Sequence, residues 1–356
     1  MGRCRRESTD AGTSDAVVRD GAPLMSIPVA WTLFPLATLV SLGASVMLVI
    51  RLERVAARLG FREATLGLIA ALAADGPEIT TAITGLLRGQ REVGIGVVLG
   101  SNVFNLAALL GLGALTAGRI RLHRDVVVFS GVVAGAIALV SVGAASGTLG
   151  AGTALGLSLA VFVPYVAVSA VSPSTLARWP VPSSFTDRLE RAVQDEESDL
   201  AAAIHPRRGD AADAALAVLA LAVVIGASVV MERSATDLGT HYRVSAIVIG
   251  GVVLGAVTSL PNAVAAVYLA GRGRGSAVLS EALNSNSLNV LLGLLVPGVF
   301  VGLVHYGGAG LLVASWYAGL TAVSLVLAYL GRGLGRISGS VVVCGYLVLV
   351  GVLVAR

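Results

Sequence analysis

The stretch that decides the fold is residues 72–105, LAADGPEITTAITGLLRGQREVGIGVVLGSNVFN. Pro77 stands inside an apolar helical segment, where it has no N–H to donate and its ring opens the preceding turn. The segment therefore predicts a helix that breaks at Pro77 and leaves the carbonyl of Ala73 without its usual donor. The carboxylates of Asp75 and Glu78 flank this break. Broken membrane helices with charge at mid-depth are typical of ion sites in transporters.

The next apolar segment ends in three polar residues, Ser101, Asn102 and Asn105. Ser101 and Asn105 are four residues apart, so they lie on one face of a helix. We expect both to contribute neutral oxygens to the cation site at the break.

The same pattern returns 184 residues later, in residues 257–289, VTSLPNAVAAVYLAGRGRGSAVLSEALNSNSLN. Pro261 matches Pro77, and Arg272 matches Arg88. The second copy of Ser-Asn-x-x-Asn consists of Ser285, Asn286 and Asn289. Two copies at one offset indicate an internal duplication.

These stretches resemble the alpha-repeats of the cation/calcium exchanger superfamily, which includes sodium/calcium and calcium/proton exchangers. The family pattern is roughly G-T-S-L-P-E, then about twenty residues, then G-N-x-x-G-S-N-x-x-N/D. The first copy keeps it in Pro77-Glu78 and Gly100–Asn105, and the second in Thr258–Pro261. In layout the likeness extends over residues 27–354. It implies a membrane antiporter whose cation site is shared by two repeats.

The composition is that of a protein that crosses a membrane many times. The chain is 56% hydrophobic and 13% charged, and its mean hydropathy is +0.86. Since about twenty apolar residues span a bilayer, we predict an all-α polytopic membrane protein with about ten transmembrane helices. They are expected at residues 27–50, 64–87, 93–116, 126–145, 151–171, 214–231, 245–270, 276–304, 310–330 and 338–354.

These helices divide into two repeats of five, residues 27–171 and 214–356. A polar leader, residues 1–26, is expected to be disordered, and the apolar run after it is too long for a signal peptide. Residues 172–213 form a cytoplasmic loop that contains a predicted helix at 183–200. Because five is odd, the two repeats enter the membrane in opposite orientations, as in the inverted repeats of secondary transporters.

The distribution of positive charge predicts the orientation. All 25 cationic side chains are Arg, and sixteen of them lie in the loops after the odd-numbered helices. The first of these loops, residues 51–63, is predicted to run along the interface. The Arg-rich side should be cytoplasmic, so both termini face outside a bacterial inner membrane. The pI near 9.4 reflects this orientation, because the sequence has no basic patch interleaved with aromatic residues that would bind nucleic acid.

Other function classes lack their motifs. The sequence has no Walker loop, no nucleotide fingerprint and no nucleophile–base pair, so we expect neither nucleotide binding nor an enzyme. Cys4 and Cys344 lie at opposite ends of the chain and predict neither a disulfide nor a metal site. The acidic cluster Asp195–Asp199 is interpreted as a solvated helix face rather than a regulatory calcium site. The expected partners are inorganic cations and the lipid bilayer, with no cofactor, and we expect a monomer.

Within the first repeat, Asp75 and Glu78 are the carboxylates well inside a predicted span. A carboxylate inside the bilayer is costly unless it is paired or coordinated. Glu78 also occupies the Pro-Glu position of the family, so we interpret it as a cation ligand. Asp75 stands where the family usually has Ser. It is either a second ligand or an acid that faces a water-filled cavity.

The second repeat supplies only neutral oxygens. Where the resemblance implies an acidic residue after Pro261, this chain has Asn262, and the Asn/Asp position of the pattern is Asn289. The candidate ligands of this repeat are Thr258, Ser259, Asn262, Ser285 and Asn289, together with the carbonyl of Val257. Asn286 lies about 100° from the Ser285/Asn289 face. It is either a site residue or a helix–helix hydrogen-bonding residue.

Glu281 lies on the same helix face as Ser285, four residues earlier. Two interpretations remain for it, a residue that lines an access path and a charge at the membrane interface.

The sequence thus predicts a secondary active antiporter that exchanges calcium for sodium or protons by alternating access. Calcium takes six to eight oxygens, and the two carboxylates would neutralise it. One alternative is a cation/proton antiporter of other specificity. The other is a transport-inactive protein that retains the fold.

Overall fold

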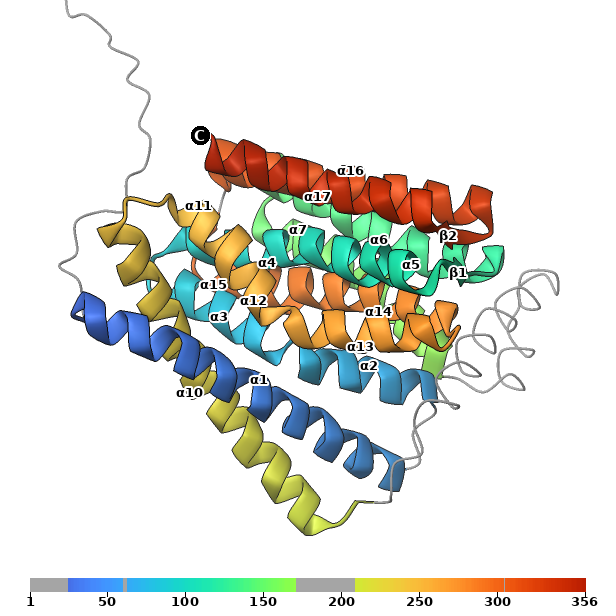
Figure 1. The fold of residues 1–356 in the computed structure, drawn as a ribbon, viewed down its shortest axis with the longest axis horizontal. Helices are drawn as coiled ribbons and strands as arrows, with labels where there is room; N and C mark the ends of the chain where they lie inside the picture. The colour runs from blue at the N-terminus through green and yellow to red at the C-terminus, as the bar shows by residue number, and fades with distance from the viewer. Residues whose placement is uncertain (1–24, 60–62, 171–208, 304) are drawn as a thin grey trace, which may run out of the picture.

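The computed structural model describes residues 25–59, 63–170, 209–303 and 305–356. The described part is almost entirely helical (Figure 1). Eight of its helices are long and apolar enough to cross a membrane, and one bent pair makes up to nine. The predicted polytopic helical class is therefore confirmed. The predicted leader, the helix at 183–200 and most of the loop at 172–213 lie outside the described residues.

Six of these candidate spans are uninterrupted helices. They are α1 (Ile27–Arg58), α6 (Arg124–Ala145), α7 (Ala151–Ala170), α10 (Ala211–His241), α16 (Gly307–Gly331) and α17 (Arg336–Val354).

The other segments are interrupted. At the first break α2 (Glu63–Ala74) meets α3 (Gly76–Leu87), and at the second α11 (Ala246–Val248), η2 (Ile249–Leu254) and α12 (Gly255–Thr258) meet α13 (Leu260–Gly271). Two further segments contain π-helix: α4 (Arg91–Asn105), η1 (Leu106–Leu112) and α5 (Gly113–Ala117), and α14 (Gly275–Leu288), η3 (Asn289–Leu295) and α15 (Val296–Phe300).

Two predicted helix ends are wrong. Helix α1 continues to Arg58, so residues 51–58 are part of this helix and not a separate link. The Nη1 atoms of Arg51 and Arg54 lie 2.6 and 3.3 Å from Oδ1 of Asp213 on α10, which stabilises this charged end as helix. Helix α10 likewise runs ten residues past its predicted end at Met231. Its polar extension is buried against neighbouring helices instead of forming a loop.

A small antiparallel sheet was not predicted. Strands β1 (Arg119–Arg121) and β2 (Gly333–Gly335) pair with Ile120 opposite Leu334. Gly333 has φ of 128°, and a Cβ there would lie 2.0 Å from the carbonyl oxygen of Ile120. The pairing thus needs glycine at this position. Strands of three residues carry too little alternation to be recognised in a sequence.

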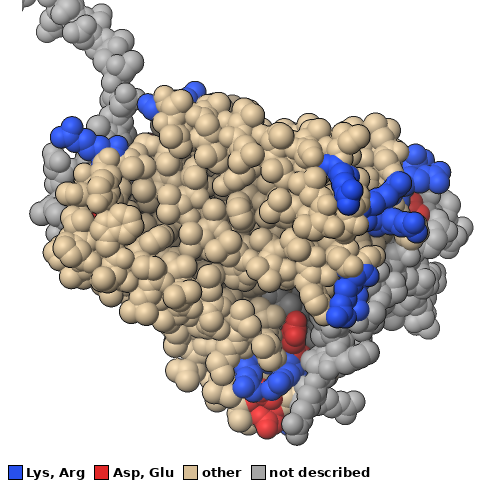
Figure 2. Space-filling view, in the orientation of Figure 1, with Lys and Arg blue, Asp and Glu red and all other residues tan. Residues whose placement is uncertain are grey.

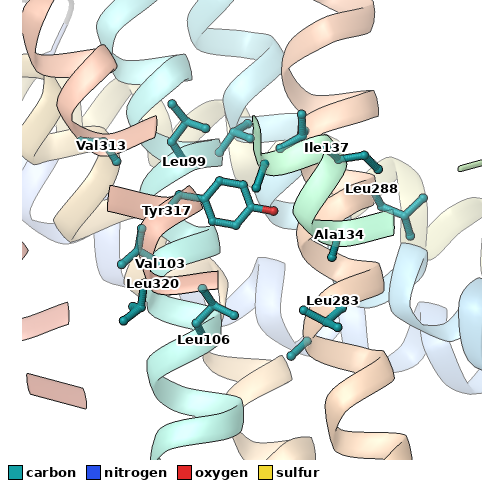
Figure 3. Close-up of a cluster of buried hydrophobic side chains, with 14 of the residues drawn as sticks. Leu99, Val103, Leu106, Ala134, Ile137, Leu283, Leu288, Val313, Tyr317 and Leu320 are labelled. Carbon is teal, nitrogen blue, oxygen red and sulfur yellow. The ribbon is translucent and has the colours of Figure 1, made fainter. Parts of the chain in front are cut away.

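The helices form a layered bundle (Figure 1). Helices α1 and α10 pack on each other at one side, next to α2 and α3, while α16 and α17 lie at the opposite side. Helices α4 and α14 run through the middle, where the apolar core surrounds the fully buried ring of Tyr317 (Figure 3). The polar ends of α4 and α14 are therefore enclosed by protein on all sides.

Three glycines set the spacing between α4 and the segment formed by η2 and α12. A Cβ on Gly100 of α4 would lie 2.2 Å from the carbonyl oxygen of Gly251 on η2, so the two backbones are in direct contact. Next to this contact, the backbone N–H of Ser101 lies against Gly255. Small residues permit such close approach between membrane helices. The contact brings the end of α4 beside the second break.

On the face drawn in Figure 2, the charged side chains of the described residues lie toward the ends of the molecule. Figure 2 shows a broad central area without charged side chains, and Arg gathers at the end where β1, β2 and the loop after α13 lie. This pattern is typical of a protein that spans a bilayer.

Candidate cation site

The first break is formed as the sequence predicts. Asp75 is the residue between α2 and α3, with Pro77 in the first turn of α3. The carbonyls of Ala73 and Ala74 accept hydrogen bonds from Oγ of Ser45 on α1, at 3.2 and 3.3 Å. The hydroxyl supplies the donor that proline removes, and the break is stabilised from a neighbouring helix.

The second break repeats this geometry. Ser259 lies between α12 and α13 with φ and ψ of −83° and −1°, close to the −75° and −5° of Asp75, its equivalent 184 residues earlier. The helices on its two sides are bent by 47°. Both predicted breaks are thus confirmed, and each presents a polar side chain at its corner.

The two breaks are bonded crosswise. Nδ2 of Asn262 donates to Oδ1 of Asp75 at 2.7 Å, and Oγ of Ser259 donates to Oε1 of Glu78. Asp75 and Ser259 are equivalent positions, and so are Glu78 and Asn262. Each carboxylate of the first repeat is therefore held by a neutral donor of the second. All four side chains are buried.

Helices α4 and α14 complete the site. Oγ of Ser285 donates to Oδ1 of Asp75 at 2.7 Å, and Nδ2 of Asn289 donates to Oε2 of Glu78. Nδ2 of Asn105 reaches Oγ of Ser285 at 3.2 Å. Hydrogen bonds join the predicted residues into two groups, and Asn102 and Asn286 connect these groups into one network. The first group is Asp75, Asn105, Asn262 and Ser285, and the second is Glu78, Ser259 and Asn289.

Asn102 and Asn286 link the two central helices symmetrically. Nδ2 of each donates to the backbone carbonyl of the other at 3.0 Å. This agrees with the helix–helix interpretation of Asn286. Each also accepts from a site residue through Oδ1, Asn102 from Asn289 at 3.3 Å and Asn286 from Asn105 at 3.2 Å. Asn102 was not among the predicted ligands, although the repeated Ser-Asn-x-x-Asn pattern contained the signal.

Two predicted residues are connected less directly. Oγ of Ser101 donates to the carbonyl of Val98 at 3.0 Å. Oγ1 of Thr258 donates to carbonyls of its own helix, at 2.8 Å to Leu254. Within the described residues, no hydrogen bond joins Thr258 to either carboxylate.

Four buried side-chain oxygens of the network have no hydrogen-bond partner within the described residues. They are Oδ2 of Asp75 and the Oδ1 atoms of Asn105, Asn262 and Asn289. An unpaired buried acceptor costs about 1–3 kcal/mol. Carboxylate and amide oxygens are also the ligands that Ca²⁺ and other hard cations prefer. These oxygen ligands therefore fit a hard cation. Among the described residues, no three His, Cys, Asp or Glu side chains are grouped so that they could hold a metal ion.

One charged pair between the end of α3 and α10 was missed. Nη1 of Arg88, at the end of α3, lies 2.6 Å from Oε2 of Glu232 on α10, and the Glu232 side chain is 0% exposed. The sequence prediction placed Glu232 in a loop because it ended this helix at Met231. The polar residues that follow Met231 gave no pattern that would have revealed their burial.

Comparison with known proteins identifies the relatives of this chain. Residues 29–171 and 213–355 each match the family model described as "Sodium/calcium exchanger protein". The inner membrane protein YrbG of Escherichia coli (strain K12) is 26% identical over 270 residues, which cover 73% of this chain and 77% of that protein.

Two solved structures share the fold. The crystal structure of the H⁺/Ca²⁺ exchanger CAX has a TM-score of 0.65 and 13% identity, and the match covers 92% of this chain and 86% of that one. The sodium-calcium exchanger NCX_Mj, soaked with 2.5 mM Na⁺ and 0.1 mM Ca²⁺, has a TM-score of 0.58 and 18% identity, with 91% and 98% covered.

Proposed function

We propose that this chain, which belongs to the sodium/calcium exchanger protein family, carries Ca²⁺ across a membrane in exchange for Na⁺ or protons. One observation carries the proposal. The buried carboxylates of Asp75 and Glu78 share one hydrogen-bond network with the amide oxygens of three asparagines, and these amide oxygens have no hydrogen-bond partner within the described residues. Such a donor set suits a partly dehydrated hard cation.

The proposed ligands divide into charged and neutral groups. Asp75 and Glu78 neutralise the two charges of Ca²⁺. Neutral oxygens come from Ser101, Asn105, Ser259, Asn262, Ser285 and Asn289, with Thr258 as a more remote candidate. Together they offer more than the six to eight ligands that Ca²⁺ takes. The transported ion is the substrate, and the proposal needs neither a cofactor nor a nucleotide.

The transport cycle we propose is alternating access between two inverted five-helix repeats, residues 27–171 and 214–356. Ten spans follow if α2 with α3, and α11–α12 with α13, each count as one broken span. On this proposal the Arg-rich end is cytoplasmic, both termini are outside, and the protein works as a monomer in a bacterial inner membrane. The likeness to an inner membrane protein of Escherichia coli supports that location.

A cation/proton antiporter of other specificity is the second candidate. The observation that favours it is that both carboxylates come from one repeat, while Asn262 and Asn289 are neutral. Two neighbouring carboxylates repel each other, and either a divalent cation or a proton relieves this repulsion.

Flux into proteoliposomes distinguishes these candidates. Uptake of radioactive Ca²⁺ would be measured with an outward Na⁺ gradient, with an outward proton gradient and with neither. We expect one gradient to drive uptake in the parent protein. Glu78→Gln should abolish uptake while the protein remains monodisperse. Absence of Ca²⁺ uptake under both gradients, in protein that is folded and reconstituted, would contradict the proposal and leave other cations or an inactive exchanger fold.

A further inference from the structure

Glu281 is a carboxylate that the proposed site does not use. It lies six residues after the start of α14, where its side chain is half-buried. Its Oε2 atom is buried and has no hydrogen-bond partner within the described residues. No ion pair to Glu281 is formed there either. A partly buried carboxylate without a partner is costly, and a positively charged ligand would offset this cost.

The nearest part of the site is Asp75. One helical turn after Glu281, Ser285 donates to Oδ1 of Asp75, at 2.7 Å. The other oxygen of Asp75, Oδ2, is buried and has no partner either. Helix α14 packs against α2, which ends next to Asp75. Glu281 and Asp75 thus each have a carboxylate oxygen without a partner within the described residues, one on α14 and the other next to the end of α2, which packs against α14.

Glu281 also lies on the way from the Arg-rich end of the molecule to the site. Helix α14 starts beside β1, where a Cβ on Gly275 would lie 2.1 Å from the carbonyl oxygen of Arg121. At 1.5 Å per residue, Glu281 is about 9 Å along α14 from this start and Ser285 about 15 Å. The arginines of this end repel an approaching cation (Figure 2). A carboxylate between them and Asp75 offsets that repulsion.

We infer that Glu281 and Asp75 form an outer cation subsite, in which Oε2 and Oδ2 hold Ca²⁺ or Na⁺ between the Arg-rich end and the Asp75/Glu78 site. This inference rests on the proposed function. The equivalent of Glu281 in the first repeat is Val97, which is buried and apolar. The subsite therefore exists on one side only, and it makes cation uptake from the two faces of the membrane unequal.

The test compares the apparent affinity for Ca²⁺ on the two faces of the membrane. The KM for Ca²⁺ would be measured separately from each face, in proteoliposomes of known orientation. Glu281→Gln should raise the KM for Ca²⁺ about fivefold when Ca²⁺ is added on the face at which α14 starts. This is the effect expected from the loss of one partly solvated charge contact. The maximal rate and the KM from the other face should not change. Glu281→Asp should restore part of the affinity. Glu92→Gln, the same change at a half-buried glutamate in the first turn of α4, is the matched control.

An equal KM change from both faces, or no change, would overturn the subsite while leaving the proposed exchange intact. If the parent protein shows no exchange, equilibrium binding of Ca²⁺ to detergent-purified protein decides instead. The subsite requires that Glu78→Gln retain weak Ca²⁺ binding and that adding Glu281→Gln remove it. Equal binding by the single and double variants would refute the subsite independently of transport.

Discussion

Exchanging Asp75 and Asn262 tests whether the site requires two carboxylates or requires them at fixed positions. These side chains have the same shape and are hydrogen-bonded at 2.7 Å, from Nδ2 of Asn262 to Oδ1 of Asp75. In Asp75→Asn/Asn262→Asp the bond can re-form in the opposite direction with no change in volume or net charge. The swap moves the charge to the position after Pro261, where the family pattern has its second acidic residue.

The single variant Asp75→Asn shows how much Ca²⁺ affinity the loss of one carboxylate costs. A unit charge about 4 Å from another, at the effective dielectric constant of a protein, interacts by about 4 kcal/mol. Removing the Asp75 charge loses at least this much interaction energy with a divalent cation, so Ca²⁺ affinity should fall by roughly a thousandfold or more. Folding should not suffer, because Ser285 and Asn262 can still donate to the new amide oxygen, and the cost of burying a charge disappears. Affinity and stability should therefore change in different directions.

Calorimetric Ca²⁺ titration of purified protein, with flux and thermal unfolding measured in parallel, gives the readout. We expect the double variant to recover affinity to within about tenfold of the parent, about 1.4 kcal/mol. A double variant as weak as Asp75→Asn would show that the position of the carboxylate matters, and the reasoning from charge count would be wrong. An Asp75→Asn variant that binds like the parent would remove Asp75 from the ligand set.

Two further predictions concern the surroundings of the site. Arg88→Met should destabilise the protein by about 3–5 kcal/mol, because it leaves the buried Glu232 carboxylate unpaired; adding Glu232→Met should restore most of the thermal stability, and additive losses would contradict the pairing. In a protein whose native cysteines have been replaced, a cysteine at Arg332 should react with an impermeant maleimide only from the cytoplasm, and one at Thr148 only from outside, both positions being exposed. The reverse pattern would invert the proposed orientation.

The breaks could be predicted because their cause is local. Pro77 and Pro261 lack an N–H and open the turn before them, and polar residues next to each proline distinguish them from Pro35 and Pro164, which lie within the uninterrupted helices α1 and α7. The meeting of the two breaks could be predicted only through the duplication, since Asp75 and Asn262 are 187 residues apart. The constant offset shows that the two copies are equivalent, and this equivalence predicts that their breaks meet. Neither copy alone predicts that contact.

What the sequence did not predict depends on particular partners. Residues 232–241 look like a loop because they are polar, yet Glu232 is buried where Arg88, 144 residues earlier, pairs with it. The strands β1 and β2 have three residues each, and their pairing depends on the close approach of Gly333 to Ile120. In both cases the stabilising group lies far away in the chain, and periodicity within a segment does not reveal it.

The arrangement of charge in the site links cation binding to the contact between the repeats. Asp75 and Glu78 both belong to the first repeat, but their hydrogen-bond donors Asn262 and Ser259 belong to the second. An N–H group that donates to a carboxylate cannot ligate a cation. Oδ1 of Asn262, which has no partner in the described part of the chain, can do so. When Asp75 binds a cation, the Asn262 amide should therefore rotate so that Oδ1 faces the cation. The hydrogen bond between Asn262 and Asp75 is then lost, and both residues ligate the same cation. Because both carboxylates belong to the first repeat and their donors to the second, this change occurs at the interface between the repeats. Alternating access has to rearrange the same interface.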